Sequence, residues 1–287
     1  MLQSVVGQTH PVREVIVVDD NSKDHSADVA ESFGLPVRLI PRPRRGGAQV
    51  AKNDGLRAAT GDTVAFLDAD DVWEGNKLSL QLPRFSDSSV GVIYCRARTF
   101  ETRSAPEARP WPVEIREGNM IREIYFLCFC PQSTVLVRQR AALEEGGVDE
   151  TLSIAHDLDL RVRLAFHWDF AAVADPVIRY RRHPGQLTRD RAMTVEEQIP
   201  VQERLAPQFR FATGMADMDR TLRVLKLLTQ ETEVLLCVHG ARRAARKVAA
   251  LALPLAVRVS GKEAKYLRRL WRRSFVPGIL LRVRRAR

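Results

Sequence analysis

The stretch TVAFLDADDVW (63–73) places four apolar residues, 64–67, directly before three carboxylates, Asp68, Asp70 and Asp71. Like charges this close repel one another, and a cation held among them relieves the repulsion. Carboxylate oxygens suit hard cations such as Mg2+ and Mn2+, which complete their coordination shells with water and substrate phosphates. The stretch therefore predicts a cation site at the end of a strand or, since acidic turns often follow strands, a solvated loop.

Strands and helices alternate around this stretch. Buried strands are predicted at EVIVVDD (14–20) and VRLIPRP (37–43), and helices at NSKDHSADVAESFG (21–34) and GAQVAKNDGLRAATG (47–61). Further strands are predicted at 90–95 and 133–138, a surface loop at 101–118, and a helix at 157–168. This alternation is typical of right-handed βαβ units, so we expect an α/β fold with a mostly parallel sheet and flanking helices.

Two acidic clusters end two of the predicted strands. Asp19 and Asp20 follow the first strand, and Asp68 to Asp71 follow the third. Ligands of parallel α/β sheets bind beyond the carboxyl ends of the strands, so we expect both clusters at one functional edge. The presence of two acidic clusters at one edge favours a cation site over a solvated loop.

Size and composition are those of a globular protein with an appendage. The chain has 287 residues, of which 45% are hydrophobic, and four cysteines without the paired spacing of a zinc site. We expect these cysteines to be small buried side chains in a reducing cytoplasm. The sequence shows neither a signal peptide nor an apolar run of about 18 residues, which favours a cytoplasmic protein.

The charge is concentrated at the C-terminal end. Residues 241–287 hold 15 Lys and Arg and one acid, so they carry +14 while the remaining residues carry −4 of the net +10. From about 217 onwards we expect amphipathic helices, interrupted at Pro254 and Pro277. The segment 257–287 interleaves Leu, Trp and Phe with Arg, which suits an anionic membrane surface on the inner face of the membrane. A helical appendage packed on the domain is the alternative, and nucleic acid is the least favoured partner.

Two α/β families share single elements with this sequence. VIVVDDN (15–21) resembles the start of a receiver domain, but the Met-Pro turn and the later Lys-Pro of that family are lacking. FLDADD (66–71) resembles the D-x-D of haloacid dehalogenases, but it lies after two strands and continues as Asp-Val-Trp rather than Gly-Thr. Neither resemblance extends to a second motif.

Four blocks in order resemble family 2 glycosyltransferases of the Rossmann-like GT-A fold. They are SVVGQTHPVREVIVVDDNSKDHS (4–26), AKNDGLRAATGDTVAFLDADDVW (51–73), GGVDETLSIAHDLDLRVRL (146–164) and YRRHPGQLT (180–188). Together they cover about two-thirds of the chain. The resemblance implies a GT-A domain at 1–205, followed by a basic helical region at 206–287.

The resemblance also implies roles for individual residues. Asp19, Asp20, Lys52, Asn53 and Asp68 would bind the nucleotide-sugar donor. Asp70 would ligate Mg2+ or Mn2+. The general base would be Asp157, taking a proton from an acceptor hydroxyl; the alternative for Asp157 is a helix cap. His183 would contact phosphate or a loop, or lie on the surface.

The implied activity is inverting, metal-dependent transfer of a sugar to a glycan or lipid-linked acceptor. Three features depart from the family pattern. Lys52 replaces Arg, His156 replaces Glu beside Asp157, and the chain begins inside the helix that follows the usual first strand. We therefore expect an exposed strand edge at 15–18, with weak folding or low activity. A non-catalytic nucleotide-sugar-binding relic or scaffold is the alternative function.

Overall fold

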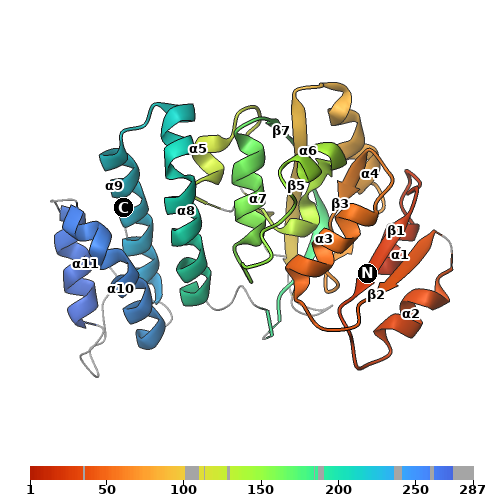
Figure 1. Cartoon of the computed structure of the whole chain (residues 1–287), viewed down its shortest axis with the longest axis horizontal. Coiled ribbons are helices and arrows are strands. Elements are labelled where there is room, and N and C mark those ends of the chain that lie inside the picture. Colours follow the sequence, from red (N-terminus) through yellow and green to blue (C-terminus); the bar gives the residue numbers. More distant parts are fainter. Residues whose placement is uncertain are drawn as a thin grey trace. The chain divides into compact units, whose positions relative to one another are not determined.

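The computed structural model describes residues 1–34, 36–100, 110–112, 114–127, 130–183, 185–186, 191–235, 241–258 and 262–273. The chain divides into two units, Met1–Gln186 and Leu187–Arg287. Each unit has its own secondary structure, strands with helices in the first and helices in the second (Figure 1).

The first unit alternates helices and strands through its N-terminal part, as the sequence predicts. Its helices are α1 (Leu2–Val6), α2 (Ser26–Ser32), α3 (Ala48–Ala58), α4 (Lys77–Gln81), α5 (Ile121–Ile124), α6 (Gln139–Glu144) and α7 (His156–Ala165), with the 3-10 turns η1 (Leu82–Ser86) and η2 (Gln132–Thr134). Its strands are β1 (Val15–Asp19), β2 (Val37–Pro41), β3 (Thr63–Ala65), β4 (Val72–Trp73), β5 (Val90–Phe100), β6 (Leu136–Arg138) and β7 (Asp169–Arg181).

These strands form two sheets of mixed direction. β1 and β2 pair in parallel as one sheet, and the second has the order β3-β6-β5-β7-β4. Within the second sheet β5 and β7 are parallel, whereas the other three pairings are antiparallel. The expectation of a mostly parallel sheet therefore needs correction. It came from strand–helix alternation in the first third of the chain, which ends after β3, and antiparallel neighbours need no helical crossover.

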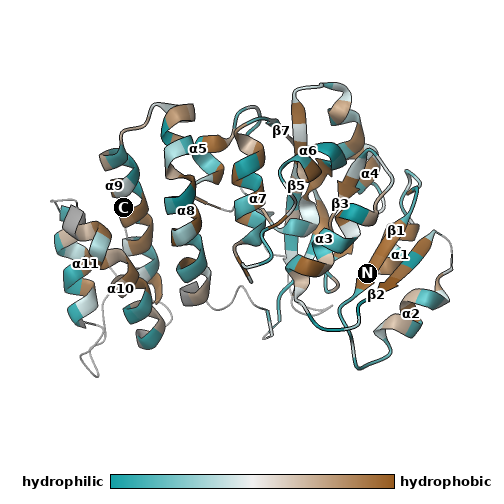
Figure 2. Cartoon of the chain, in the orientation of Figure 1, coloured by the Kyte–Doolittle hydropathy of each residue, from teal (hydrophilic) through white to brown (hydrophobic). Residues whose placement is uncertain are grey.

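The core of the first unit lies around β5 and β7. Ile93, Cys95 and Ile178 are fully buried there, and Val5 and Trp73 pack into the same cluster from α1 and β4. In Figure 2 the strands β1, β2 and β3 are largely brown, whereas the helices carry both teal and brown residues. Cys95 and Cys130 are buried free thiols, in agreement with the expected role; Cys128 and Cys237 lie outside the described residues.

The second unit is helical. It contains α8 (Arg191–Thr213), α9 (Asp217–Glu233), α10 (Arg242–Arg258) and α11 (Lys262–Arg273). α10 packs against α8, α9 and α11, and the buried residues include Phe209, Leu225 and Val248. No helix within the described ranges is long and apolar enough to cross a membrane.

Helix α8 bears on the expected domain boundary. The boundary expected at 205/206 falls inside α8, and the chain divides before this helix begins. The expected interruption at Pro254 is wrong, because Pro254 lies within α10. Pro277 lies outside the described residues, as does most of the loop expected at 101–118.

Candidate functional site

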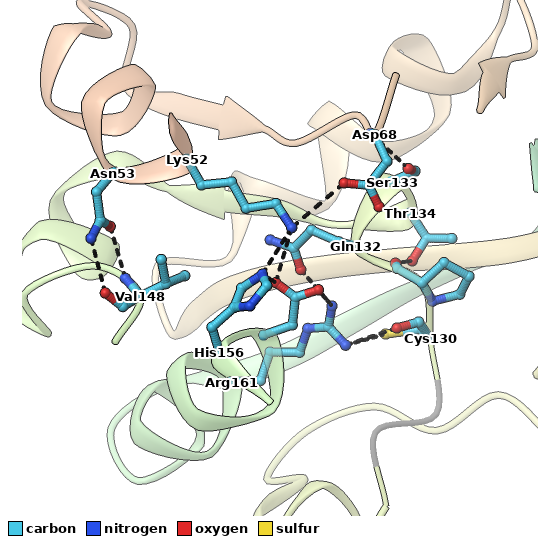
Figure 3. A network of polar contacts seen from close by, with 12 residues as sticks. Lys52, Asn53, Asp68, Cys130, Gln132, Ser133, Thr134, Val148, His156 and Arg161 are labelled. Atoms are coloured by element: carbon cyan, nitrogen blue, oxygen red, sulfur yellow. Dashed lines mark hydrogen bonds and ion pairs between the residues drawn. The ribbon is translucent and has the colours of Figure 1, made fainter. Parts of the chain in front are cut away.

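Three separate segments bring charged side chains together in the first unit. α3 supplies Lys52, the loop after β3 supplies Asp68, and the start of α7 supplies His156 and Asp157. Figure 3 shows Lys52 reaching from α3 toward His156, with Asp68 at the end of the strand segment on the other side. Residues about 100 positions apart in sequence therefore meet in one polar network.

Lys52 is the centre of this network. Its Nζ lies 3.3 Å from Asp157 Oδ1 and 3.5 Å from Asp68 Oδ1. It also lies 3.1 Å from His156 Nε2, which in turn lies 3.0 Å from Asp157 Oδ1. His156 Nε2 accepts from Lys52 when unprotonated and donates to Asp157 when protonated, and it cannot do both at once.

The network fixes the charge states of its members. Burial alone would raise the pKa of Asp157, but the positive charge of Lys52, the contact with the His156 imidazole and the positive charge of Arg161 outweigh it and hold that pKa far below its ordinary value. Burial disfavours the ammonium of Lys52, yet Asp157 and Asp68 outweigh burial and raise the pKa of Lys52. Both groups are therefore charged near neutral pH.

Arg161 supports Asp157 from the next turn of α7. Its Nη2 lies 3.8 Å from Asp157 Oδ2 and donates to Gln132 Oε1 at 2.5 Å, and its Nη1 donates to the carbonyl of Cys130 at 2.8 Å. The guanidinium is buried and tied to the segment around η2. Figure 3 shows Arg161 beside Gln132 and Cys130 of this segment. Arg161 thus fixes both this segment and the Asp157 carboxylate.

Asp70 lies next to a histidine that follows β7. Its Oδ2 is 2.9 Å from His183 Nε2, and its backbone carbonyl accepts from Arg181 Nε at 2.9 Å. Within the described segments no group of three or more His, Cys, Asp or Glu side chains is placed to hold a metal. The Asp70 carboxylate is thus held by His183, and its oxygens suit a hard cation that takes its other ligands from water and a diphosphate.

Asp71, the third carboxylate of the opening stretch, is fully buried. Its carboxylate accepts from Ser133 Oγ at 2.5 Å and from the backbone N–H of Arg181 at 2.9 Å. Burial raises the pKa of Asp71 to about 7, against the effect of these hydrogen bonds. Asp71 thus joins the acidic loop to β7 and η2 and is not available to a ligand.

Asp19 and Asp20 lie away from this network. Asp20 accepts from the backbone N–H groups of Gly46 and Gly47, both at 2.8 Å, and pairs with Arg42. Asp19 Oδ2 accepts from the N–H of Ser22 at 3.2 Å. In the described part of the chain neither shares a hydrogen bond or ion pair with the Lys52 network. Asp20 fixes the turn that precedes α3, and its part in nucleotide binding stays a prediction.

Asn53 is a buried clamp. Its Nδ2 donates to Val148 O at 2.9 Å and to Glu150 Oε1 at 2.8 Å, and its Oδ1 accepts from Val148 N at 2.9 Å. Gly147 lies against it with a φ of +75°, and a Cβ at Gly147 would lie 2.3 Å from Asn53 Oδ1. Asn53 thus holds α3 to the loop before α7, which places Lys52 opposite Asp157.

Sequence reasoning missed Arg161 and left the role of His183 open. Arg161 occupies the place of the Trp in the family pattern E-D-x-D-L-W-x-R-L, and a charged residue at that position is the signal that could have revealed it. Ser133 was also missed, because a serine before a strand carries no distinctive pattern. His183 lies beside Asp70, which agrees with a position at the predicted site.

Comparisons with known proteins bear on the family and the fold of the chain. The model of the family described as "Glycosyl transferase family 2" matches residues 1–147. The amylovoran biosynthesis glycosyltransferase AmsB of Erwinia amylovora is 30% identical over 185 residues, which cover 60% of this chain and 61% of AmsB. The Escherichia coli protein WfgD, named UDP-Glc:alpha-D-GlcNAc-diphosphoundecaprenol beta-1,3-glucosyltransferase, is 34% identical over 94 residues, or 32% of this chain and 37% of WfgD. For three of the curated relatives the chain spans only 30 to 38% of their length.

Solved structures share the fold. S. aureus TarS 1–349 in complex with UDP-GlcNAc has a TM-score of 0.62 at 18% identity, covering 96% of this chain and 84% of that one. The mannosyltransferase PcManGT of Pyrobaculum calidifontis, in complex with GDP-Man and Mn2+, has a TM-score of 0.54 at 19% identity, covering 93% and 73%. At these identities the likeness shows the fold alone, and the expected GT-A fold is confirmed.

Proposed function

Because the chain belongs to glycosyl transferase family 2, we propose that it transfers a sugar from a nucleoside-diphosphate sugar to a hydroxyl group of a glycan or lipid-linked acceptor. The observation that carries this proposal is the meeting of Lys52, Asp68 and Asp157 in one network. Two relatives support the acceptor class, one named as an amylovoran biosynthesis glycosyltransferase and one as a glucosyltransferase for alpha-D-GlcNAc-diphosphoundecaprenol.

In the proposed reaction Asp157 is the general base. It removes the proton of the acceptor hydroxyl while that oxygen forms a bond to the anomeric carbon. The bond from this carbon to the phosphate oxygen breaks on the opposite face, and the nucleoside diphosphate leaves with the electron pair. A single displacement of this kind inverts the anomeric centre.

The donor would bind along the acidic loop. Asp68 and Lys52 would line the nucleotide side, together with Asp19 and Asp20, whereas Asn53 would act indirectly by holding α3 in place. Asp70, beside His183, would hold Mg2+ or Mn2+, which when bound neutralises charge on the departing diphosphate. The PcManGT complex with GDP-Man and Mn2+ supports a divalent cation in this role.

Asp157→Asn tests the proposed base. The substitution keeps the size of the side chain but removes its basicity, so we expect transfer to fall by about 10²- to 10⁴-fold. Calorimetry with UDP, GDP and dTDP in the presence of Mn2+ should show nucleotide binding in both proteins. Equal transfer rates for wild type and variant would reject Asp157 as the base.

A nucleotide-sugar-binding relic is the second candidate. The ion pairs of Asp157 with Lys52, His156 and Arg161 favour it, because a carboxylate so engaged is a weak base. A relic would bind a nucleoside diphosphate without any transfer or hydrolysis of the sugar by the wild-type protein. Turnover that is lost in Asp157→Asn would exclude it.

We also propose that the second unit docks on an anionic membrane from the cytoplasmic side. Supporting this, five cations at helical spacing lie exposed on α11 and make no ion pair within the described ranges: Lys262, Lys265, Arg268, Arg269 and Arg272. The apolar residues Ala264, Leu267 and Leu270 are buried, and α11 packs against α9 and α10. Docking would therefore be electrostatic, without insertion of the buried face.

A further inference from the structure

The carboxylate of Asp157 is engaged on both oxygens. Oδ1 lies 3.3 Å from Lys52 Nζ and 3.0 Å from His156 Nε2, and Oδ2 lies 3.8 Å from Arg161 Nη2. The thiol of Cys130 also faces Asp157, and burial raises the pKa of that thiol and so keeps it neutral. Cations thus approach Asp157 from α3 and from α7 itself.

A carboxylate in this setting is a poor proton acceptor. Its ionised form is stabilised by the surrounding positive charge, and this is why the pKa of Asp157 lies far below its ordinary value despite burial. A general base is most effective when its pKa lies near the working pH. Asp157 therefore needs to lose a cation before it can act efficiently on an acceptor hydroxyl.

Of the three groups that contact the Asp157 carboxylate, Lys52 can leave most easily. Arg161 is fixed by hydrogen bonds to Cys130 O and Gln132 Oε1, and His156 is buried in the first turn of α7. Lys52 instead has a flexible four-carbon stem, and its Nζ already lies 3.5 Å from Asp68 at the edge where the donor would bind. A rotation of this side chain needs no movement of α3.

We propose that Lys52 leaves Asp157 for the diphosphate when the donor binds, so that Asp157 becomes an effective base only in the donor complex. This inference rests on the proposed function. It makes Lys52 a positioning residue that couples occupancy of the donor site to proton transfer at the acceptor site. The diphosphate, with its negative charges, competes with Asp157 for the same ammonium group.

Titration of the Asp157 carboxyl carbon by ¹³C NMR tests the inference, with Asp157→Asn used to assign the signal. In the wild-type protein we expect UDP or GDP with Mg2+ to raise the pKa of Asp157 by about 1 to 3 pH units. In Lys52→Gln the pKa should already be raised without nucleotide, and nucleotide should raise it less. The control variant Arg57→Gln removes another cation of α3, one that pairs with Asp54 and Glu150. In this variant the pKa of Asp157, with and without nucleotide, should equal that of the wild type.

The outcomes separate this inference from the proposed function. If calorimetry shows nucleotide binding but the pKa of Asp157 does not change, the coupling is wrong and the proposed function stands. The coupling is also wrong if Lys52→Gln shows the same nucleotide-induced rise as the wild type. If none of UDP, GDP and dTDP binds, the proposed function fails and the coupling fails with it. Should Lys52→Gln not fold, Lys52→Arg keeps the charge, and its more rigid guanidinium should give a smaller nucleotide-induced rise than the wild type.

Discussion

At the scale of single residues, Lys77 is an unusual side chain for a hydrophobic core. It is fully buried in α4, its Nζ has no hydrogen-bond partner among the residues that the structure describes, and it lies 4.2 Å from the centre of the Trp73 ring. Burial lowers the pKa of Lys77 to about 7. The Trp73 ring offsets only part of the free-energy cost of burying the ammonium group. The free energy of folding should therefore depend on the protonation of this amine.

The sign of this dependence follows from linkage. Between pH 7 and about 10.5 the unfolded chain holds the Lys77 proton and the folded chain does not, so the free energy of unfolding rises with pH by about 1.4 kcal/mol per pH unit from this group. Below pH 7 the full penalty of burying the charge applies. We predict that Lys77→Met stabilises the protein at pH 6 to 7, and that its difference from wild type shrinks as pH rises to 10. Urea unfolding at several pH values measures this; a constant difference would contradict it.

Gly147 and Gly146 form a matched pair for the clamp on Asn53. Both have positive φ, +75° and +78°, but an added Cβ meets Asn53 only at Gly147. Gly146→Ala should lower the free energy of unfolding by about 1 kcal/mol through backbone strain alone. Gly147→Ala should lower it by about 2 to 4 kcal/mol, because the clamp must also shift. Chemical denaturation compares the two, and equal losses would mean that the clamp contributes little.

The site was predictable from sequence to the extent that its residues stand in recognisable blocks. Lys52, Asp68 and Asp157 were predicted as site residues, and the structure brings them together. Their mutual contacts were not predictable, because the ion pairs depend on the geometry between α3 and α7. The burial of Asp71 was equally invisible, since DADD gives no sign of which carboxylate turns inward toward Ser133.

At the scale of elements, the N-terminus of α3 explains Asp20 without a ligand. Asp20 accepts from the N–H groups of Gly46 and Gly47 and pairs with Arg42, so it fixes the turn that leads into α3. We predict that Asp20→Ala lowers the free energy of unfolding by about 1 to 2 kcal/mol. Thermal or urea unfolding without nucleotide measures this, and an unchanged stability would leave nucleotide binding as the role of Asp20.

The helices and strands in the first third of the chain were predictable because each shows a clear pattern of apolar residues and a recognisable residue at its end. α2 ends before Gly34, whose φ is +61°, and α3 starts after Gly47. The strand pairings later in the chain were not predictable. β3 and β4 are only three and two residues long, so their sequences show almost no pattern of apolar residues. The register of β6 between β3 and β5 is set by tertiary packing rather than by local sequence.

At the scale of the whole molecule, charge differs between the two units. Residues 187–287 hold 22 Lys and Arg against 9 acids, whereas residues 1–186 hold 23 against 26. The proposed docking should therefore depend on the second unit and weaken with salt, since added ions screen exposed charges over about 8 Å at 0.15 M. Vesicles of phosphatidylglycerol and phosphatidylcholine in a flotation assay provide the measurement.

A fourfold charge reversal tests the docking face on α11. Because each basic residue near an anionic surface contributes about 1 kcal/mol, we expect reversal to abolish vesicle binding. The docking variant is Lys265→Glu, Arg268→Glu, Arg269→Glu and Arg272→Glu. The matched control reverses four exposed cations of α8 and α9: Arg204→Glu, Arg210→Glu, Arg223→Glu and Lys226→Glu. Equal flotation of both variants would reject α11 as the docking face.

The division of the strands into two sheets has a consequence for handling the protein. Among the described strands β1 pairs only with β2, and β3 pairs only with β6, so each presents one row of backbone donors and acceptors without a strand partner. Such rows recruit strands from other molecules. We therefore expect self-association that grows with protein concentration, and better recovery of monomer from dilute, cold preparations than from concentrated ones.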